Sequence, residues 1–517
     1  MNVDQSTIIP EAGKRDWLPQ SESLDRRTAS ERLNAYDNAY FSHRSYMIAS
    51  LPPVLQAVCA ELNQAGYRPV VVGGAVRDAL LGLAATDFDV EVYGVSYDKL
   101  AEFLSLRGRV DLVGRSFGVV KFTASQSGTF DFSIPRRDSK VGSHHRDFLA
   151  VFDPRITPKE AASRRDFTIN SMGFDAITGE LLDFFGGADD LHNRVLRATS
   201  AAFSEDPLRV LRGLQFACRF SLSVDPKTAE MSRSIVHEYS TLARERVAGE
   251  FLKWATKSAD PGRIADYLRE TGWLVHYPEI DKLFGVPQDP QWHPEGDVGV
   301  HTMYVLNEAS RIAERDQLDD HDRAILLFSA LAHDFAKPAT TELRDRDGQL
   351  RWTSWGHEPA GGPMARAFLE RIGIQASIVD PVVKLVESHL AHHAIAGADG
   401  AITKRAVRRL ALRISPANIQ QLARLIEADA SGRPPLEKGL PPTAQKMLDA
   451  ARDEAVHTGP QAPLLLGRHV LPYFDNRSGK HIGDVARIAY AAQADGAFST
   501  EEEALRWLKQ FMASRVQ

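Results

Sequence analysis

The chain contains few residues that could form covalent cross-links: it has two cysteines, Cys59 and Cys218, among 517 residues. Two cysteines exclude a disulfide-rich scaffold and a cysteine-rich zinc site, and they favour a reducing compartment. The chain also lacks an apolar run long enough to span a bilayer, and no secretory signal pattern stands at its start. We therefore expect a cytoplasmic location.

The chain also lacks a strong charge of either sign, since 62 Lys and Arg stand against 68 Asp and Glu, a formal net charge of −6. This balance alone does not indicate a nucleic-acid-binding protein, but local basic patches matter more than the sum. A composition of 43% hydrophobic and 25% charged residues is typical of globular proteins. A length of 517 residues predicts several domains.

Two common glycine motifs for binding phosphates are absent near the first buried strand: neither G-x-G-x-x-G nor a P-loop G-K-S/T is found there. Residues 70–94 read VVVGGAVRDALLGLAATDFDVEVYG instead. This pattern predicts a strand that turns at Gly73 and Gly74 into a helix. Paired glycines let the backbone approach a phosphate closely, although tight packing of strand on helix would explain them equally well.

Asp87 and Asp89 lie two residues apart on the next predicted strand. Alternate residues of a strand point to the same face, so the two carboxylates can hold one divalent cation. A solvated strand face is the simpler alternative. Asp131, in the strand-like run GTFDFSIPRR, is our candidate for a third carboxylate, and Glu91 competes with it because Glu91 shares a face with Asp87 and Asp89.

Three further strings carry charge at regular spacing. RRDFTINSMGFD offers Arg165, Asp166 and Asn170 for phosphate and sugar. EDPLRVLRGLQFACRF places Asp206 and Arg209 three residues apart on a predicted helix, where a carboxylate beside a guanidinium can read a base edge. A surface ion pair would look the same. RERVAGEFLKW carries Arg246 and Glu250 at helical i,i+4 spacing.

In this order the strings resemble the class II tRNA nucleotidyltransferase and bacterial poly(A) polymerase family, over residues 68–275. The resemblance implies a polymerase-β-like head in which Asp87 and Asp89, with Asp131 as third carboxylate, bind catalytic Mg²⁺. It also implies that Gly73, Gly74, Arg77 and Asp78 shape the triphosphate loop. Arg165, Asp166 and Asn170 would contact phosphate and ribose. Glu205, Asp206 and Arg209 would select CTP and then ATP, supported by Arg246 and Glu250.

The helical half of the chain carries most of the histidines, in the order H…HD…H…H…D. Histidine and carboxylate ligands suit divalent transition metals, and single histidines are more often ordinary buried polar residues. The order resembles HD-domain metal-dependent phosphohydrolases. By that resemblance His301, His333, Asp334 and Asp429 are the core ligands of a metal such as Ni or Mn, and His357 and His389 complete a second metal position.

The implied fold class is α+β: a nucleotidyltransferase head with a mixed sheet, a helical neck, an all-α HD domain and a small helical C-terminal unit. We expect an N-terminal extension over 1–48, the head over 49–200, the neck over 201–292, the HD domain over 293–437 and a tRNA-binding tail over 438–517. The alternative for the tail is a helical cap over apolar surface. The basic run 134–148 is expected to be a loop that contacts RNA phosphates, or else only a solvated loop. Ser499 is expected to begin the last helix.

The implied activity is addition and repair of the 3′-terminal CCA of tRNA from CTP and ATP, with an HD-domain phosphatase or 2′,3′-cyclic phosphodiesterase activity. A poly(A) polymerase, or an enzyme that adds only CC or only A, shares the same core motifs. A phosphohydrolase whose first half merely binds RNA is the alternative from another class, and the intact Asp87 and Asp89 pair argues against it.

Overall fold

The computed structural model describes residues 51–85, 87–112, 118–124, 128–140, 148–153, 155–397 and 400–514. The expected N-terminal extension over 1–48 lies outside these residues. The chain divides into two compact units. The first comprises residues 1–137, 150–161 and 172–184, and the second comprises 138–149, 162–171 and 185–517. Within the described part, no helix is both long and apolar enough to cross a membrane.

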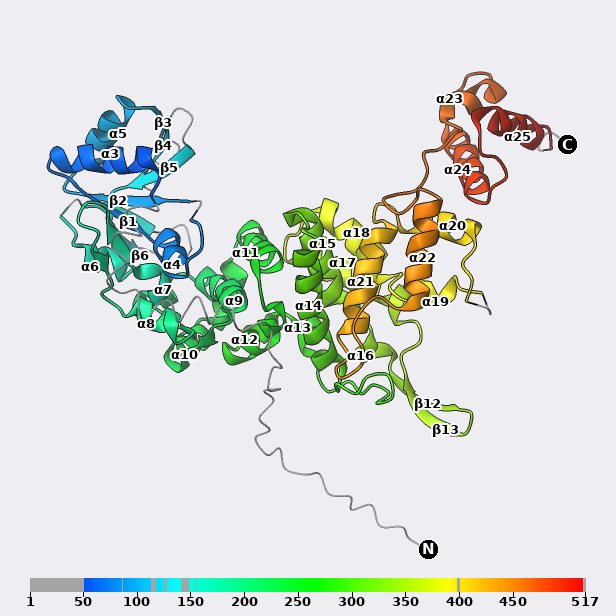
Figure 1. The fold of residues 1–517 in the computed structure, drawn as a ribbon, viewed down its shortest axis with the longest axis horizontal. Coiled ribbons are helices and arrows are strands. Elements are labelled where there is room, and N and C mark those ends of the chain that lie inside the picture. Colours follow the sequence, from blue (N-terminus) through cyan, green and yellow to red (C-terminus); the bar gives the residue numbers. More distant parts are fainter. Residues whose placement is uncertain are drawn as a thin grey trace, which may run out of the picture. The chain divides into compact units, whose positions relative to one another are not determined.

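The first unit is built on a mixed seven-stranded sheet of order β3-β4-β5-β2-β1-β8-β9 (Figure 1, blue and cyan). Its strands are β1 (Arg68–Val72), β2 (Asp89–Tyr93), β3 (Arg109–Asp111), β4 (Val119–Ala124), β5 (Gly128–Ser133), β8 (Gly173–Asp175) and β9 (Leu181–Leu182). Strands β2 and β5 run parallel, whereas the other neighbours are antiparallel. Burial alternates along β4, with Val120, Phe122 and Ala124 facing the core, as the period of a strand requires.

The described residues of this part of the chain include four helices: α3 (Pro53–Gln64), α4 (Gly74–Leu80), α5 (Tyr97–Ser105) and α6 (Pro158–Ala162). The strands expected before Gly73, at Asp87 and Asp89 and at Asp131 are present as β1, β2 and β5. The basic run 134–148 is not simply a loop, because β6 (Arg136–Lys140) within it pairs with β7 (Phe148–Phe152), which begins at its last residue, in a separate two-stranded sheet. Residues 141–147 of that run lie outside the described residues.

The neck is mainly helical. The helix expected over 206–220 from the spacing of its apolar residues is present as α9 (Leu208–Phe220). The second unit also includes α7 (Thr168–Ser171), α8 (Gly187–His192) and β10 (Val195–Leu196), which lie within the range expected for the head. The elements of the neck are η2 (Ala201–Glu205), α9, β11 (Ser223–Val224), α10 (Pro226–Ser234), η3 (Val236–Thr241), α11 (Arg244–Lys257), η4 (Pro261–Arg263), α12 (Ile264–Glu270), η5 (Trp273–His276) and α13 (Pro278–Asp281). Gly213 permits a close approach between α9 and α12, since a Cβ there would lie 2.2 Å from the hydroxyl oxygen of Tyr267.

Residues 298–453 form an array of helices: α14 (Val298–Arg315), α15 (Asp320–Ala332), α16 (Lys337–Thr340), α17 (His357–Arg371), α18 (Ala376–Val386), α19 (Ala391–Ala394), α20 (Lys404–Ile414), α21 (Ile419–Ser431) and α22 (Pro442–Asp453). The apolar helix α15 is buried from Ala324 onward and packs against α14, α18 and α21. One hairpin, β12 (Glu342–Arg346) with β13 (Gln349–Thr353), interrupts the helices. The sequence analysis did not predict it, because its five β12 residues are all exposed and carry no alternating pattern.

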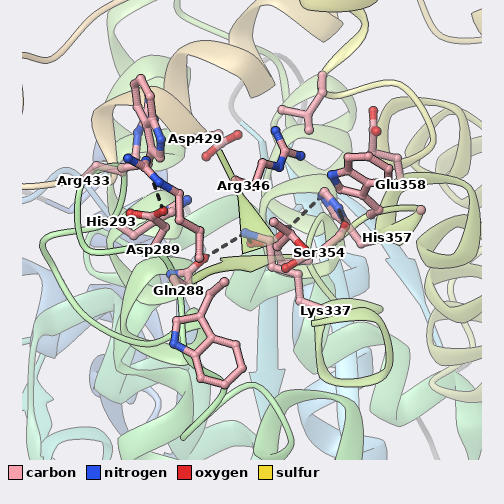
Figure 2. Close-up of a pocket in the computed structure, with 18 of the residues that line it drawn as sticks. Gln288, Asp289, His293, Lys337, Arg346, Ser354, His357, Glu358, Asp429 and Arg433 are labelled. Atoms are coloured by element: carbon pink, nitrogen blue, oxygen red, sulfur yellow. Dashed lines mark hydrogen bonds and ion pairs between the residues drawn. The ribbon is translucent and has the colours of Figure 1, made fainter. Parts of the chain in front are cut away.

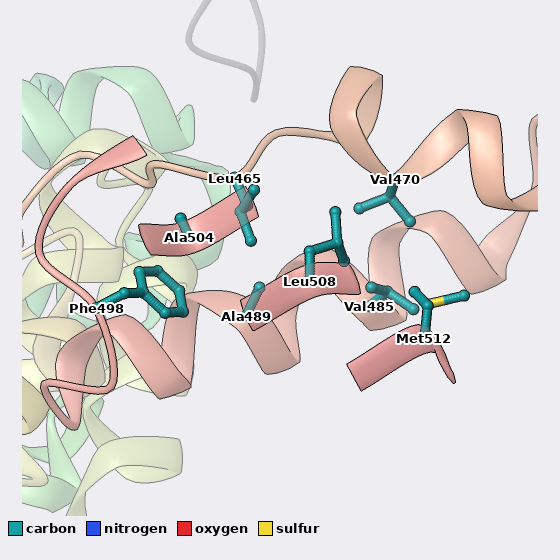
Figure 3. Close-up of a cluster of buried hydrophobic side chains, with 8 residues drawn as sticks. All are labelled: Leu465, Val470, Val485, Ala489, Phe498, Ala504, Leu508 and Met512. Atoms are coloured by element: carbon teal, nitrogen blue, oxygen red, sulfur yellow. The ribbon is translucent and has the colours of Figure 1, made fainter. Parts of the chain in front are cut away.

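The chain ends in a small helical unit of α23 (Gly467–Val470), η6 (Leu471–Phe474), α24 (Lys480–Ala494) and α25 (Glu501–Ala513). Its core is a cluster of eight apolar side chains, among them Val485, Phe498 and Leu508 (Figure 3). Thr500 rather than Ser499 caps α25, because its hydroxyl and the Glu503 side chain form a reciprocal capping box. Asp495 attaches the unit to α20 through ion pairs with Arg405 and Arg409.

Candidate functional site

The glycine turn joins β1 to α4 in the first unit. Gly73 has φ 75° and ψ −131°, a conformation that essentially only glycine adopts, and its N–H donates to the Met172 carbonyl. Arg77 on α4 is buried and forms an ion pair of 2.7 Å with Asp78. The turn therefore needs glycine at position 73 and leaves Gly74 at the first position of α4.

Three carboxylates follow at the next strands. Asp87 and Asp89 are exposed on either side of the buried Phe88, which agrees with the expected alternation. Asp131 on β5 is the register partner of Asp89 on β2, so the two side chains stand on the same face of adjacent strands. Glu91 lies opposite Ser133 instead, and its carboxylate accepts a hydrogen bond of 2.7 Å from the Tyr93 hydroxyl.

The second unit holds the Glu205–Arg209 string at the junction of η2 and α9. One oxygen of Asp206 accepts from the Leu208 N–H at 2.9 Å, and the other is 2.9 Å from Arg246 on α11. Arg209 donates to the carbonyl oxygens of Ala202 and Arg164, at 2.6 and 2.8 Å. The side chain of Asp206 is thus held by the Leu208 N–H and Arg246, and that of Arg209 by two carbonyl oxygens of the same region.

Asp166 is a buried anchor of the same unit. Its carboxylate accepts hydrogen bonds from Arg212, Asn170 and the Phe167 N–H at 2.7, 3.1 and 2.8 Å. Burial raises the pKa of Asp166, but the charge of Arg212 and these hydrogen bonds outweigh it and hold the pKa below its usual range. Arg165 donates to the Asn170 carbonyl at 3.3 Å.

Arg212 is a residue that the sequence analysis missed. It lies 4.0 Å from Glu250 as well as beside Asp166, and so links α9, α11 and the α7 segment. Glu250 also pairs with Lys253 at 2.9 Å. Arg246 and Glu250 therefore sit on one helix but bind different partners. The spacing of Arg212 was the sequence signal that could have identified it: Arg212 follows Arg209 by three residues, which makes the two neighbours on a helix.

The histidines of the helical half converge from five elements. His301 comes from α14, His333 and Asp334 from the end of α15, His357 from the start of α17, His389 from the segment after α18, and Asp429 from α21. Among the described residues, three groups have ligand atoms within 4.8 Å of one another: His301, His333 and Asp429; Asp334, His357 and His389; and His293, Glu295 and His301. All six residues expected from the sequence are thus brought together. Among the described residues, Asp87, Asp89 and Asp131 of the first unit do not form such a group.

The ring orientations suit a metal. The Nδ1 atoms of His333, His357 and His389 face the carbonyls of Ala330, Ser354 and Val386 at 2.8, 2.6 and 2.8 Å. If each Nδ1 carries the proton, each Nε2 presents a lone pair. The Nε2 atoms of His357 and His389 face each other at 3.1 Å. Burial lowers the pKa of His357 to about 4, which keeps its ring neutral.

Unpartnered atoms at the same place fit a divalent cation. His333 Nε2 and Asp334 Oδ1 are buried and form no regular hydrogen bond with a described residue, although Asp334 Oδ2 lies 3.2 Å from the first and His357 Nε2 lies 3.5 Å from the second. Burying such polar atoms costs free energy unless an ion or a water molecule binds them. Burial raises the pKa of Asp429, but hydrogen bonding from His301 and the nearby imidazole charges hold it well below its usual range. Imidazole and carboxylate together are donors that suit transition metals.

Two residues support these ligands and were not predicted as site residues. Glu295 lies 2.8 Å from His301 Nδ1 and 2.9 Å from His293, so it orients His301 toward Asp429 at 3.1 Å. Lys337 is buried with its Nζ 2.7 Å from Asp334 and 2.8 Å from Gln288. Two sequence signals could have pointed to them: an acid in the string QWHPEGD (residues 291–297), and a lysine three residues after Asp334.

A cavity of about 910 Å³ opens beside this centre. Asp334, His357, His389 and Asp429 line it together with Lys337. Figure 2 shows Arg346, Arg433 and Lys337 around the same space, with His357 hydrogen-bonded to Ser354. A ligand much larger than a metal ion therefore has room against these side chains.

Comparison with known proteins gives both halves a family. Residues 70–197 match the poly A polymerase head domain, and residues 298–428 match the HD domain. The multifunctional CCA protein of Xanthomonas campestris pv. campestris (strain B100) is 35% identical over 437 residues, which cover 82% of this chain and 98% of that protein. This chain belongs to the multifunctional CCA protein family. The multifunctional CCA protein of Actinobacillus pleuropneumoniae serotype 5b (strain L20) is also 35% identical, over 70% of this chain and 85% of that protein.

Solved structures share the fold of this chain. The CCA-adding enzyme of Bacillus stearothermophilus in complex with CTP has a TM-score of 0.60 at 17% identity, over 90% of this chain and 99% of that one. The Thermotoga maritima CCA-adding enzyme complexed with tRNA has a TM-score of 0.52 at 18% identity, over 91% and 98%. The expected fold class is confirmed: a head with a mixed sheet, a helical neck and an HD domain. The protein is a nucleotidyltransferase, and both of its catalytic families depend on metal ions.

Proposed function

We propose that this protein adds and repairs the 3′-terminal CCA of tRNA from CTP and ATP, in the cytoplasm. The observation that carries the proposal is the identity of 35% to a multifunctional CCA protein over 98% of that protein's length. The likeness runs through the head, the neck and the HD domain together, which supports a shared activity rather than a shared fold alone.

Within the head, we assign the binding of Mg²⁺ to Asp87, Asp89 and Asp131. The support is their place on one face of β2 and β5, with Asp89 and Asp131 in register. Mg²⁺ bound there would neutralise charge on the triphosphate and on the RNA hydroxyl that attacks it. Gly73, Gly74, Arg77 and Asp78 shape the turn that would receive the triphosphate. Transfer then needs little covalent work from the protein, since the hydroxyl attacks the α-phosphate in line and pyrophosphate leaves.

Nucleotide selection falls to the η2–α9 junction in this proposal. Asp206 and Arg209 present an acceptor and a donor fork of the kind that can pair with a base edge. Arg246 holds Asp206 from α11, while Glu205 lies 4.0 Å from Arg164. Arg165, Asp166 and Asn170 would serve phosphate and ribose, with Arg212 and Glu250 keeping Asp166 in place.

We further propose that the HD centre removes terminal phosphates or opens 2′,3′-cyclic phosphates on RNA ends, with Ni²⁺ or Mn²⁺ bound. His301, His333, Asp334 and Asp429 would be the core ligands, with His357 and His389 at a second position. A bound metal of this kind activates water and stabilises charge on phosphate. The unpartnered His333 Nε2 and Asp334 Oδ1 support this assignment. Phosphate removal by the HD centre would complement CCA addition, because CCA addition needs a free 3′ hydroxyl.

Three tRNA substrates test the main proposal. Transcripts that lack CCA, CA or A are incubated separately with labelled CTP or labelled ATP. The proposal predicts that the first two accept CMP and that the third accepts only AMP. Incorporation of AMP into all three alike would favour the alternative, a poly(A) polymerase. Failure of the transcript lacking only A would indicate a CC-adding specialist, and failure of the other two would indicate an A-adding one.

A further inference from the structure

The cavity beside the HD centre has an aromatic wall. Trp292, Trp352 and Trp355 line it, and they are 56%, 37% and 62% exposed. Trp292 belongs to the segment before α14, Trp352 lies on β13, and Trp355 follows that strand. Indole rings are normally covered in folded proteins, and exposed rings gathered in one concavity are typical of a surface that stacks on a ligand.

Guanidinium groups accompany these rings. Arg346 lies 5.0 Å from the centre of the Trp355 ring, and it forms no ion pair with any residue that the structure describes. Arg433 donates to the Ala430 carbonyl and is likewise without a carboxylate partner in the described chain. Arg351 differs, because Asp289 at 3.6 Å and Gln291 at 2.7 Å engage it. Figure 2 shows Arg346 and Arg433 in the same close-up as Asp429 and His357. Arg346 and Arg433 are therefore available to an anion.

The size of the cavity limits the choice of ligand. A phosphate bound to a metal would fill a small part of about 910 Å³, which lies in the range of pockets that hold drug-sized molecules. The same cavity is lined by the ligands Asp334, His357 and His389 and by the tryptophans. A ligand that joins a phosphate to an aromatic base matches both parts.

We propose that this aromatic wall is the base-binding half of the HD site. It takes the terminal nucleotide of an RNA 3′ end that carries a 3′-phosphate or 2′,3′-cyclic phosphate. The base stacks on Trp355 or Trp292, Arg346 and Arg433 meet backbone phosphate, and the terminal phosphate reaches the metal ligands. The inference rests on the proposed HD activity and adds to it a source of substrate choice. Stacking accepts any base, so the site reads the RNA end without reading its sequence.

The test compares Trp355→Ala and Trp292→Ala with Leu350→Ala. Leu350 is 68% exposed on the same hairpin but does not line the cavity, so it is a matched control. Hydrolysis is measured on 2′,3′-cAMP and on glycerol 2-phosphate, which has no base. We expect KM for 2′,3′-cAMP to rise about tenfold in the variant that removes the stacking ring, Trp355→Ala or Trp292→Ala, with kcat nearly unchanged. KM for glycerol 2-phosphate should stay the same, and Leu350→Ala should match the unaltered protein. Equal KM values for 2′,3′-cAMP in all four proteins would overturn the inference.

A second comparison separates an RNA end from a free nucleotide. A short RNA ending in a 2′,3′-cyclic phosphate should have a lower KM than 2′,3′-cAMP, because Arg346 and Arg433 would bind a backbone phosphate that 2′,3′-cAMP lacks. A higher KM for the RNA overturns the assignment to RNA ends.

If no substrate is hydrolysed, binding of labelled 3′-AMP to the Mn²⁺-loaded protein is measured with CTP present to fill the head. Weaker binding by the tryptophan variants then supports the inference while the hydrolytic proposal fails. Unchanged binding overturns the inference by itself.

Discussion

Asp131 on β5 lies directly beside Asp89 on β2, as register partners in the parallel pair of the head sheet. The sequence left two candidates for a third metal-binding carboxylate. Glu91 stands one step further along that face, opposite Ser133, and the Tyr93 hydroxyl occupies one of its oxygens. The pairing of β2 with β5 therefore favours Asp131.

This relationship predicts different effects for two similar substitutions. Asp131→Asn should lower nucleotide addition more than about 100-fold, as should Asp87→Ala and Asp89→Ala, because each removes charge that would hold Mg²⁺. Glu91→Gln should stay within a few-fold of the unaltered enzyme. The measurement is incorporation of labelled nucleotide into tRNA, with thermal unfolding as the check on folding. A strong defect in Glu91→Gln with normal activity in Asp131→Asn would reverse the assignment.

The Arg212 link to Asp166 should matter for stability and for its dependence on pH. Arg212→Met leaves a buried carboxylate without its main partner, and we expect a loss of about 2–4 kcal/mol in the free energy of unfolding. Lys227→Met removes an exposed positive charge from α10 and should change it little. Denaturant titrations of the three proteins measure these differences.

The pH profile of that loss has a definite sign. The pKa of Asp166 is lowered in the folded protein, so its contribution is present above the unfolded pKa of about 3.9 and is lost only as pH falls through the lower folded value. In Arg212→Met the burial that raises this pKa is no longer opposed by Arg212. The loss of stability on acidification that comes from Asp166 should therefore be smaller in Arg212→Met than in the unaltered protein. Identical profiles would show that Arg212 does not control Asp166.

Gly73 should not tolerate a side chain. At φ 75° and ψ −131° an alanine is strained, so Gly73→Ala should cost about 1–3 kcal/mol of stability and weaken nucleotide addition. Gly483 is the matched control, since it lies within α24 and an added Cβ would meet no atom within 4 Å. Gly483→Ala should stabilise the protein by up to about 1 kcal/mol. Unfolding and tRNA assays on both variants check the contrast.

The HD centre should be separable from nucleotide addition. Asp334→Asn removes a ligand common to the buried centre, so it should abolish retention of Mn²⁺ or Ni²⁺ and hydrolysis of 2′,3′-cAMP. Addition to an undamaged tRNA with a free 3′ hydroxyl should continue. Metal content of the purified protein and the two activity assays measure this. Loss of both activities in a folded Asp334→Asn protein would contradict two independent sites.

The sequence predicted what regular periods encode. The run of valines at 70–72 predicted a buried strand, and apolar residues at helical spacing predicted α9. Both patterns follow directly from the geometry of strands and helices. The candidate ligands His301, His333, Asp334 and Asp429 were predicted from their order along the chain, and the structure brings them together.

The remaining features depend on packing between distant segments. The link from Arg212 to Asp166 joins residues 46 positions apart, and the contact of Glu295 with His301 depends on how the linker folds back. The tryptophan wall could not be predicted from the sequence, because Trp292, Trp352 and Trp355 come from different segments and recur with no regular period. The cap at Thr500 rather than Ser499 was a choice between two adjacent hydroxyls that only the capping box resolves.

The length of the product on tRNA tests the central claim most directly. A tRNA transcript lacking CCA is incubated with the protein, Mg²⁺, CTP and a large excess of ATP, and the labelled products are resolved at single-nucleotide resolution. The account predicts growth by three nucleotides, C, C and A, and then no further extension. A ladder of many added adenosines, or no extension at all, would contradict it.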